Sequence, residues 1–300
     1  MTSSSNPPAV VSPPSGEVRV SPAAESARIS RRNLLLAIVP VLVLLITFLF
    51  WYQTWFGRPL SDAEMAEYLA DTAAPHKIQH AVAQLGERMA RGDPTARRWY
   101  PQLLALARNP APQLRLMAAW AMGQDNHSEE FHQTLRGLLA DPEPLVRWNA
   151  ALGLVRFGDA AGEPQLRAML RPFTVPAPQA GMLHFKSKEL DDLPNGAAVA
   201  RIEVGNGAKP LDVVSPISGA LAERLVKDGA EVAPGEPVAL IRPGEAQVWE
   251  SLRALYLVGR PQDLQDVERY ARDVPGMSER VRQQAELTAQ AIRRRAAKGD

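Results

Sequence analysis

The chain contains no cysteine. Disulfides, thiolate zinc sites, CxxCH haem attachment and a thiol nucleophile are therefore excluded. A dominant charge is absent as well, because 34 lysines and arginines oppose 33 aspartates and glutamates and leave a formal net charge of +1. This balance gives no whole-chain reason for binding nucleic acid, and we expect no such partner.

The common catalytic motifs are also missing, since no nucleophile elbow, phosphate loop or HExxH segment occurs. His76 and His80 share one helix face, but no third metal ligand accompanies them. The segment NHSEEFH (126–132) collects possible ligands in what we expect to be an exposed loop between helices. We therefore predict a protein that is not an enzyme and has no catalytic residue, metal or cofactor.

The N-terminal region has two parts of different composition. The first thirty residues hold eight serines and five prolines and no aromatic residue, which predicts a disordered tail over 1–30. From Leu34 to Tyr52 there is no charge. At about 1.5 Å per residue, this apolar run roughly spans a hydrocarbon core. We expect a transmembrane anchor over 31–57, which contacts the membrane through residues 34–52.

Charges around this apolar run predict its orientation. Arg28, Arg31 and Arg32 precede it, whereas acidic residues predominate after it. The positive-inside rule then places the N-terminus in the cytoplasm. A cleaved signal peptide is disfavoured, because the basic lead-in is long and no small-x-small site follows. We predict a single-pass inner-membrane protein with its C-terminal bulk periplasmic or extracytoplasmic.

A helical repeat follows. NPAPQLRLMAAWAMGQD (109–125) aligns with DPEPLVRWNAALGLVRF (141–157) at an offset of 32 residues, and both prolines, the arginine and two alanines are identical. Such a period predicts stacked helix pairs in which small alanines allow close approach. The Trp- and Leu-rich faces are expected to form the repeat core. Upstream, Ser61 and Glu64 predict a capping box that opens the first helix.

These segments resemble HEAT repeats. The resemblance covers roughly 60–171, and it implies that the Arg-x-x-Ala segment begins the second helix of each pair. It also implies that an acidic residue pairs with an arginine in a ladder between repeats. The matching positions are Asp141, Arg147 and Arg115, whereas Asn109 stands where a further acid is expected.

The helical pattern stops near Arg171 and returns near the C-terminus. VRQQA (281–285) matches VRWNA (146–150), and we expect a further helical repeat pair over 246–297. The stretch between is rich in valine, glycine and proline, with closely spaced turn signals that predict a small β domain. VPAPQAGML (175–183) aligns with VVSPISGAL (213–221), so we expect two interlocking halves.

The second half contains SPISGALAERLVKDGAEVAPGEPVAL (215–240), which resembles the biotinyl/lipoyl family, whose fold is called the barrel-sandwich hybrid. That family implies a carrier lysine at the tip of the hairpin between the halves. Here the turn signal is Gly205–Gly207, and Lys209 lies off that tip before Pro210. We expect Lys209 to be unmodified. An unmodified hybrid beside a membrane anchor resembles the module of membrane fusion proteins, which implies a link to transport.

The predicted fold class is α+β multidomain: an α-solenoid interrupted by a small all-β hybrid, with one N-terminal transmembrane helix. The predicted parts are the tail (1–30), the anchor (31–57), the HEAT-like repeats (58–171), the hybrid (172–245) and a C-terminal helical repeat (246–300). We expect a membrane-anchored periplasmic scaffold or adaptor that binds protein partners at an envelope complex. The alternative is a lipoyl- or biotin-type carrier that uses Lys209 as its cofactor attachment site.

Overall fold

A computed structural model describes residues 40–48, 58–204 and 209–299. The chain divides into two compact units, Met1–Arg58 and Pro59–Asp300. In the first unit the described residues 40–48 are helical.

The predicted localisation is contradicted. Within the part of the chain that the structure describes, no helix combines the length and the apolar character needed to cross a membrane. The described helix over 40–48 is shorter than the predicted span over 34–52, and the remainder of that span lies outside the described residues. The predicted tail over 1–30 lies outside them as well.

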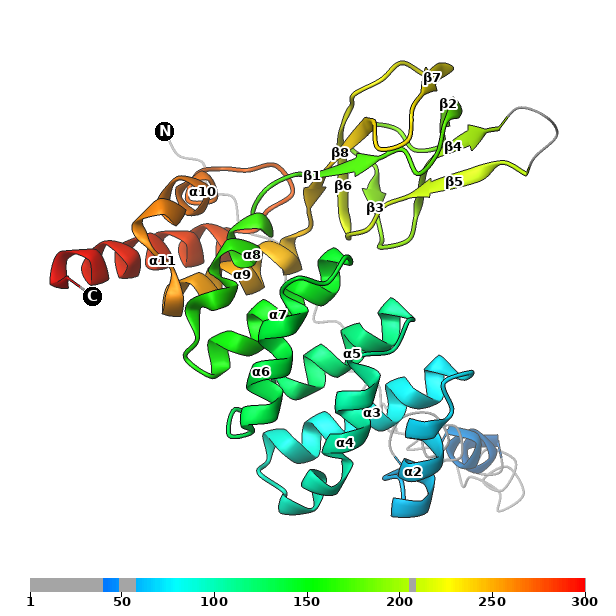
Figure 1. The fold of residues 1–300 in the computed structure, drawn as a ribbon, viewed down its shortest axis with the longest axis vertical. Coiled ribbons are helices and arrows are strands. Elements are labelled where there is room, and N and C mark those ends of the chain that lie inside the picture. The colour runs from blue at the N-terminus through cyan, green and yellow to red at the C-terminus, as the bar shows by residue number, and fades with distance from the viewer. Residues whose placement is uncertain (1–39, 49–57, 205–208, 300) are drawn as a thin grey trace, which may run out of the picture. The chain divides into compact units, whose positions relative to one another are not determined.

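The Pro59–Asp300 unit begins with an array of antiparallel helices (Figure 1). The second helix of each pair contacts its neighbours, α3 against α5 and α5 against α7, while α2, α4 and α6 pack beside them. The bounds, with short 3-10 helices labelled η, are α2 (Asp62–Ala70), α3 (Pro75–Ala90), η1 (Pro94–Trp99), α4 (Tyr100–Leu106), α5 (Pro112–Met122), α6 (Glu129–Leu138), α7 (Pro144–Arg156), η2 (Ala160–Gly162) and α8 (Glu163–Ala168).

Local signals explain where these helices begin. Pro112 and Pro144 open α5 and α7, where the fixed φ of proline suits the first turn and its missing N–H is not needed. The predicted capping box is confirmed, because Ser61 Oγ accepts from Glu64 N at 3.3 Å and Glu64 Oε2 accepts from Ser61 N at 2.9 Å.

Eight strands follow α8 and form two four-stranded antiparallel sheets. One has the order β1-β8-β6-β3 and the other β5-β4-β2-β7. Position by position, β1 corresponds to β5, β8 to β4, β6 to β2 and β3 to β7, so the strands at equivalent positions are always four apart in chain order. Neither sheet closes on itself. The bounds are β1 (Phe173–Pro176), β2 (Gly181–Phe185), β3 (Asp192–Leu193), β4 (Ala198–Glu203), β5 (Leu211–Val214), β6 (Gly219–Arg224), β7 (Ala230–Val232) and β8 (Pro237–Pro243).

The chain enters and leaves this β region at one place. The first strand, β1, pairs antiparallel with the last, β8, so that Phe173 faces Ile241. Gln247 Nε2 donates to the carbonyl oxygen of Met169 at 2.9 Å, which joins the two flanking segments. The β region therefore begins and ends side by side, and the helices on either side of it can pack together.

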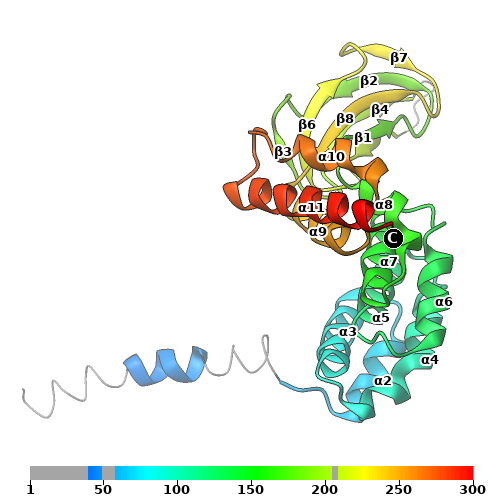
Figure 2. The same ribbon diagram turned by 90° about the vertical axis from the view of Figure 1, so that its left-hand side faces the viewer.

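The helical array resumes with α9 (Glu245–Val258), η3 (Pro261–Asp263), α10 (Leu264–Arg269) and α11 (Glu279–Lys298). Helix α9 packs on both α7 and α8, and Ser251 Oγ donates to the carbonyl oxygen of Leu166 at 2.6 Å. Helix α11 packs on α9 and α10. In both views α8 and α9 lie between the strands and α2–α7 (Figures 1 and 2).

The segment predicted as a helical pair, 246–297, contains α9, α10 and α11, and α9 packs on α11. Helix α9 also continues the row α3–α5–α7 and packs on α8, which precedes the strands. The helices on the two sides of the β region are therefore in contact with one another. The sequence did not predict the contact between α8 and α9, because α8 is only six residues long.

Two clusters of buried apolar side chains stabilise the unit. One joins α2–α7 and includes Leu85, Leu114 and Phe131. The other runs from α7 through the interiors of both sheets to α11, and it includes Leu183, Ile241 and Ile292. The β region consequently shares a core with the C-terminal helices, whereas the first helices have a core that does not depend on it.

Candidate protein-binding groove

Three adjoining hollows lie along the row formed by α3, α5, α7 and α9. The central hollow, of about 580 Å³, lies between α5, α7 and α9. An apolar hollow of about 350 Å³ adjoins it toward α3 and shares Trp120 and Asn149 with it. A polar hollow of about 710 Å³ shares Gln124 and Arg156 with it. We call these three together the groove.

The 32-residue repeat explains which side chains face the groove. Three repeat-equivalent pairs of residues line it: Met117 and Asn149, Trp120 and Leu152, and Gln124 and Arg156. Within each helix these positions follow the spacing i, i+3, i+7, which places them on one face. The groove was not predicted from the sequence, although this spacing within the aligned repeat is a signal that indicates a shared face.

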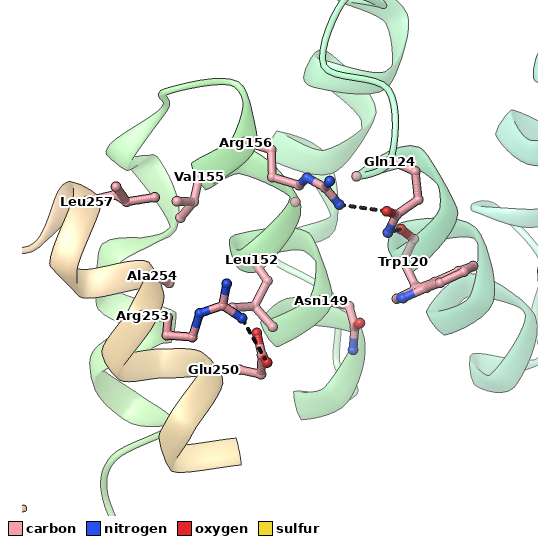
Figure 3. A pocket seen from close by; sticks show the side chains of 12 residues that line it. Trp120, Gln124, Asn149, Leu152, Val155, Arg156, Glu250, Arg253, Ala254 and Leu257 are labelled. Atoms are coloured by element: carbon pink, nitrogen blue, oxygen red, sulfur yellow. Dashed lines mark hydrogen bonds and ion pairs between the residues drawn. The ribbon is translucent and has the colours of Figure 1, made fainter. Parts of the chain in front are cut away.

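Trp120 lies at the junction of the apolar and central hollows and is 42% exposed. The prediction that the Trp-rich helix faces form the core is therefore wrong for Trp120. It is confirmed for Trp148, which is 4% exposed. A Cβ added to Gly86 on α3 would lie 2.7 Å from Trp120 Cζ3. The missing side chain at Gly86 therefore lets the indole lie on α3. Figure 3 shows the indole nitrogen on the side that faces Asn149.

The floor of the central hollow is a close contact between two helices. A Cβ added to Gly123 on α5 would lie 3.0 Å from Gly153 Cα on α7, and one added to Gly153 would lie 3.0 Å from Leu135 Cδ1. Both glycines therefore allow α5 and α7 to approach closely, and larger side chains at either position would fill or widen the floor.

Hydrogen bonds hold the polar side chains of the central hollow. Arg156 Nη1 donates to Gln124 Oε1 at 2.6 Å, and Asn126 Nδ2 donates to the carbonyl oxygen of Arg156 at 2.9 Å. On α9, Arg253 and Glu250 form an exposed ion pair at 3.6 Å (Figure 3). Leu257 of α9 is 61% exposed at the end of the hollow. The groove thus combines exposed apolar groups with fixed polar ones.

The carboxylates of the polar hollow are occupied by internal bonds. The Tyr100 hydroxyl donates to Asp125, and burial together with this bond raises the pKa of Tyr100. Although burial opposes it, the bonds from Tyr100 and from the His127 backbone N–H hold the pKa of Asp125 below its usual value. Bonds from the Thr95 hydroxyl and backbone N–H likewise lower the pKa of Asp93. Both acids stay charged and bonded at neutral pH.

The predicted ladder lies apart from the groove. Arg115 makes a bidentate ion pair with Asp141, with Nε to Oδ2 at 2.7 Å and Nη2 to Oδ1 at 2.9 Å. Its Nη1 donates to the carbonyl oxygens of Asn109 and Pro110, and Arg147 Nη1 donates to the equivalent oxygens of Asp141 and Pro142. The ion pair joins consecutive helix pairs, and the carbonyl bonds tie each arginine to the turn before its own helix.

The ladder changes at its next step. Arg147 Nε donates to the amide oxygen of Gln165 at 3.3 Å, whereas the equivalent Nε of Arg115 donates to the carboxylate of Asp141. Arg171 instead makes a bidentate pair with Asp266 on α10, with its shortest contact at 2.6 Å. The arginine ladder therefore continues across the inserted β region through residues that the repeat alignment did not contain.

Lys209 lies just before β5 and is exposed. It makes no hydrogen bond or ion pair with any part of the chain described, and the predicted turn at Gly205–Gly207 lies outside the described residues. His80 contacts Gln84, with Nε2 and Nε2 3.0 Å apart, and His132 contacts Asp159. Across residues 40–48, 58–204 and 209–299, no three His, Asp or Glu side chains are grouped to hold a metal.

The comparison with known families agrees with the helical geometry. Residues 100–173 match the family model for HEAT repeats. The matched segment contains α5 and α7, which supply most of the groove, and it supports the predicted HEAT-like repeats there. No curated protein gives a significant match to the chain. HEAT arrays generally bind other proteins, which is compatible with a scaffold role.

Proposed function

We propose that this protein is a non-enzymatic scaffold or adaptor that binds another protein through the groove. The observation that carries the proposal is Trp120, an exposed aromatic side chain where two hollows of a HEAT-like array meet. Tryptophan and arginine are the residues whose truncation most often weakens a protein interface, and they act best in central pockets. Trp120 and Arg156 both line the central hollow.

We propose the β region, over 172–245, as an unmodified biotinyl/lipoyl-like barrel-sandwich hybrid, with HEAT-like repeats over 58–171 and a helical repeat over 246–300. The hybrid is supported by the internal symmetry of the region: the four strands of its first half, β1–β4, and the four of its second half, β5–β8, occupy equivalent positions in the two sheets. In this proposal the hybrid is a second recognition surface that the helices carry.

The carrier function is the alternative, because the exposed Lys209 could accept a lipoyl or biotinyl group. The mass of the intact protein from its native host separates the two. The scaffold proposal expects no added mass on Lys209 and an unchanged function in Lys209→Arg. A stoichiometric adduct on Lys209 would replace the proposal with the carrier function.

A photo-crosslinking pair tests the groove. One variant carries a photoreactive amino acid in place of Leu257, which lines the groove. The control carries the same amino acid in place of Leu287 on α11, which is also an exposed leucine, at 49% exposed. We expect a defined protein to be captured in intact cells from position 257 and not from position 287. Capture at 257 should also fall when Trp120→Ala is present. Equal capture from both positions, or capture that ignores Trp120→Ala, would refute the groove.

A further inference from the structure

The two ends of the groove differ in chemistry. The apolar hollow is lined by Val82, Ala83, Leu116, Met117 and Trp120, with Gln79 and Asn149 at its margin. It suits one leucine or aromatic side chain, since apolar lining with few polar groups is typical of side-chain pockets. On α5 it is lined by Leu116, Met117 and Trp120, whereas the polar hollow is lined by Gln124–His127, past the last turn of that helix.

The charges that remain free at the other end are positive. Asp93 and Asp125 are bonded internally, and Glu250 is paired with Arg253. Arg97 and Arg156 are both exposed, and neither forms an ion pair with a carboxylate of the described chain. Arg156 uses one guanidinium nitrogen for Gln124, which leaves further N–H groups as donors. An incoming carboxylate therefore finds donors there and no unpaired acid.

From these two ends we infer that the occupant of the groove is a protein segment with an apolar anchor side chain in the apolar hollow and an acidic side chain at Arg156. The inference rests on the proposed function, whose partner it specifies. Bidentate recognition of a carboxylate by arginine supplies orientation as well as affinity.

The helix geometry sets the spacing between the two side chains. Met117 on α5 and Gln124, two residues past its end, mark the two ends, and seven residues at about 1.5 Å each separate them by about 10 Å along the direction of the helix axis. An extended segment covers that distance in about three residues, and a helical one in about seven. The partner segment therefore carries its acid about three residues from the anchor if extended, or about seven if helical.

A displayed library of random twelve-residue peptides, selected on the full chain, tests this. We expect enrichment of Leu, Phe or Trp together with Asp or Glu at one of the two spacings. The best peptide, made synthetically, should bind at least tenfold more weakly to Arg156→Glu and to Trp120→Ala. It should bind normally to Arg108→Glu, an exposed arginine outside the groove. Melting temperatures of all variants show that they remain folded.

A charge exchange supplies a result that a structural role of Arg156 would not produce. Replacing the peptide's acid by lysine should weaken binding to the natural chain and restore it on Arg156→Glu. Selected peptides without an acid, whose binding still falls with Trp120→Ala, would overturn the inferred chemistry and leave the scaffold function standing. No enrichment, or binding indifferent to every groove substitution, would overturn both.

A single-stranded oligonucleotide serves as the competing class of ligand. It should not displace the acidic peptide, because a phosphate chain supplies no apolar anchor side chain for the apolar hollow. Displacement that disappears in Arg156→Glu would overturn the inference in favour of a polyphosphate ligand.

Discussion

Glu163 on α8 and Asp263 on η3 bury their carboxyl groups against one another beside Arg167. Asp263 is fully buried and Glu163 is 4% exposed. Within the described structure Glu163 Oε1 and Asp263 Oδ1 each lack a hydrogen-bond donor, and Arg167 Nη1 lies 3.9 Å from the first and 3.8 Å from the second. Burial, followed by the contact with Glu163, raises the pKa of Asp263 to about 7. The pair is therefore best satisfied when it shares one proton.

This pair predicts stability that falls as the pH rises. The unfolded carboxyl has a pKa of about 3.9, so between about pH 4 and 7 the folded state holds a proton that the unfolded state has lost. The free energy of unfolding should decrease by up to about 1.4 kcal/mol per pH unit in that window. Urea unfolding at several pH values measures it. Glu163→Gln, whose amide can donate permanently to Asp263, should flatten the dependence, and an unchanged slope in this variant would contradict the shared proton.

The bidentate pair between Arg115 and Asp141 predicts a larger effect than ordinary surface ion pairs. Asp141 is 8% exposed, and its removal would leave the mostly buried guanidinium of Arg115 without its charged acceptor. We expect Asp141→Ala to lower the free energy of unfolding by about 2–3 kcal/mol. The control is Glu87→Ala, which breaks the exposed Arg91–Glu87 pair and should cost less than about 0.5 kcal/mol. Similar losses of unfolding free energy in both variants would show that the Arg115–Asp141 pair stabilises the chain no more than a surface ion pair does.

The close packing of the repeat predicts intolerance of a larger side chain at Ala150. This alanine on α7 is fully buried. Ala150→Leu should destabilise the chain by about 1–3 kcal/mol, because extra volume in a packed core forces its neighbours apart. Ala105 on α4 is exposed, and Ala105→Leu should leave the melting temperature nearly unchanged. A tolerated leucine at Ala150 would show that the two helices are not in close contact.

The two core clusters predict what removal of the β region does. Replacing residues 172–245 by a short linker is sterically feasible, because β1 and β8 lie side by side. Helices α2–α6 should stay folded since their core is separate, whereas α9–α11 should lose stability with the apolar side chains of the sheets. Hydrogen exchange resolved by segment measures both. Protection lost throughout α2–α6, or fully retained in α9–α11, would contradict this division.

Several features of the fold were accessible from the chain alone because their signals are local. The prolines of the repeat mark the starts of α5 and α7, and the 32-residue offset made Arg115 and Arg147 equivalent, as their matching bonds to preceding carbonyls show. The β character of the inserted segment followed from its turn residues and valines. Each of these signals lies within a few residues of the structure that it specifies.

The candidate site depended on contacts that the local pattern does not encode. Trp120 and Trp148 lie on neighbouring helices of the repeat, yet Trp120 is 42% exposed in the groove and Trp148 is buried in the core shared with the β region. A membrane span was expected from hydropathy, and the described helices do not contain one.

The type of most elements and the equivalence of the repeats could be predicted from the chain, since backbone restrictions and hydrophobic period act over short distances. The contact of α8 with α9 across the inserted strands, and that of Glu163 with Asp263, could not be predicted in this way. Those contacts join segments far apart in the chain, and their partners are selected by the shape and burial of the assembled core, which no local pattern records.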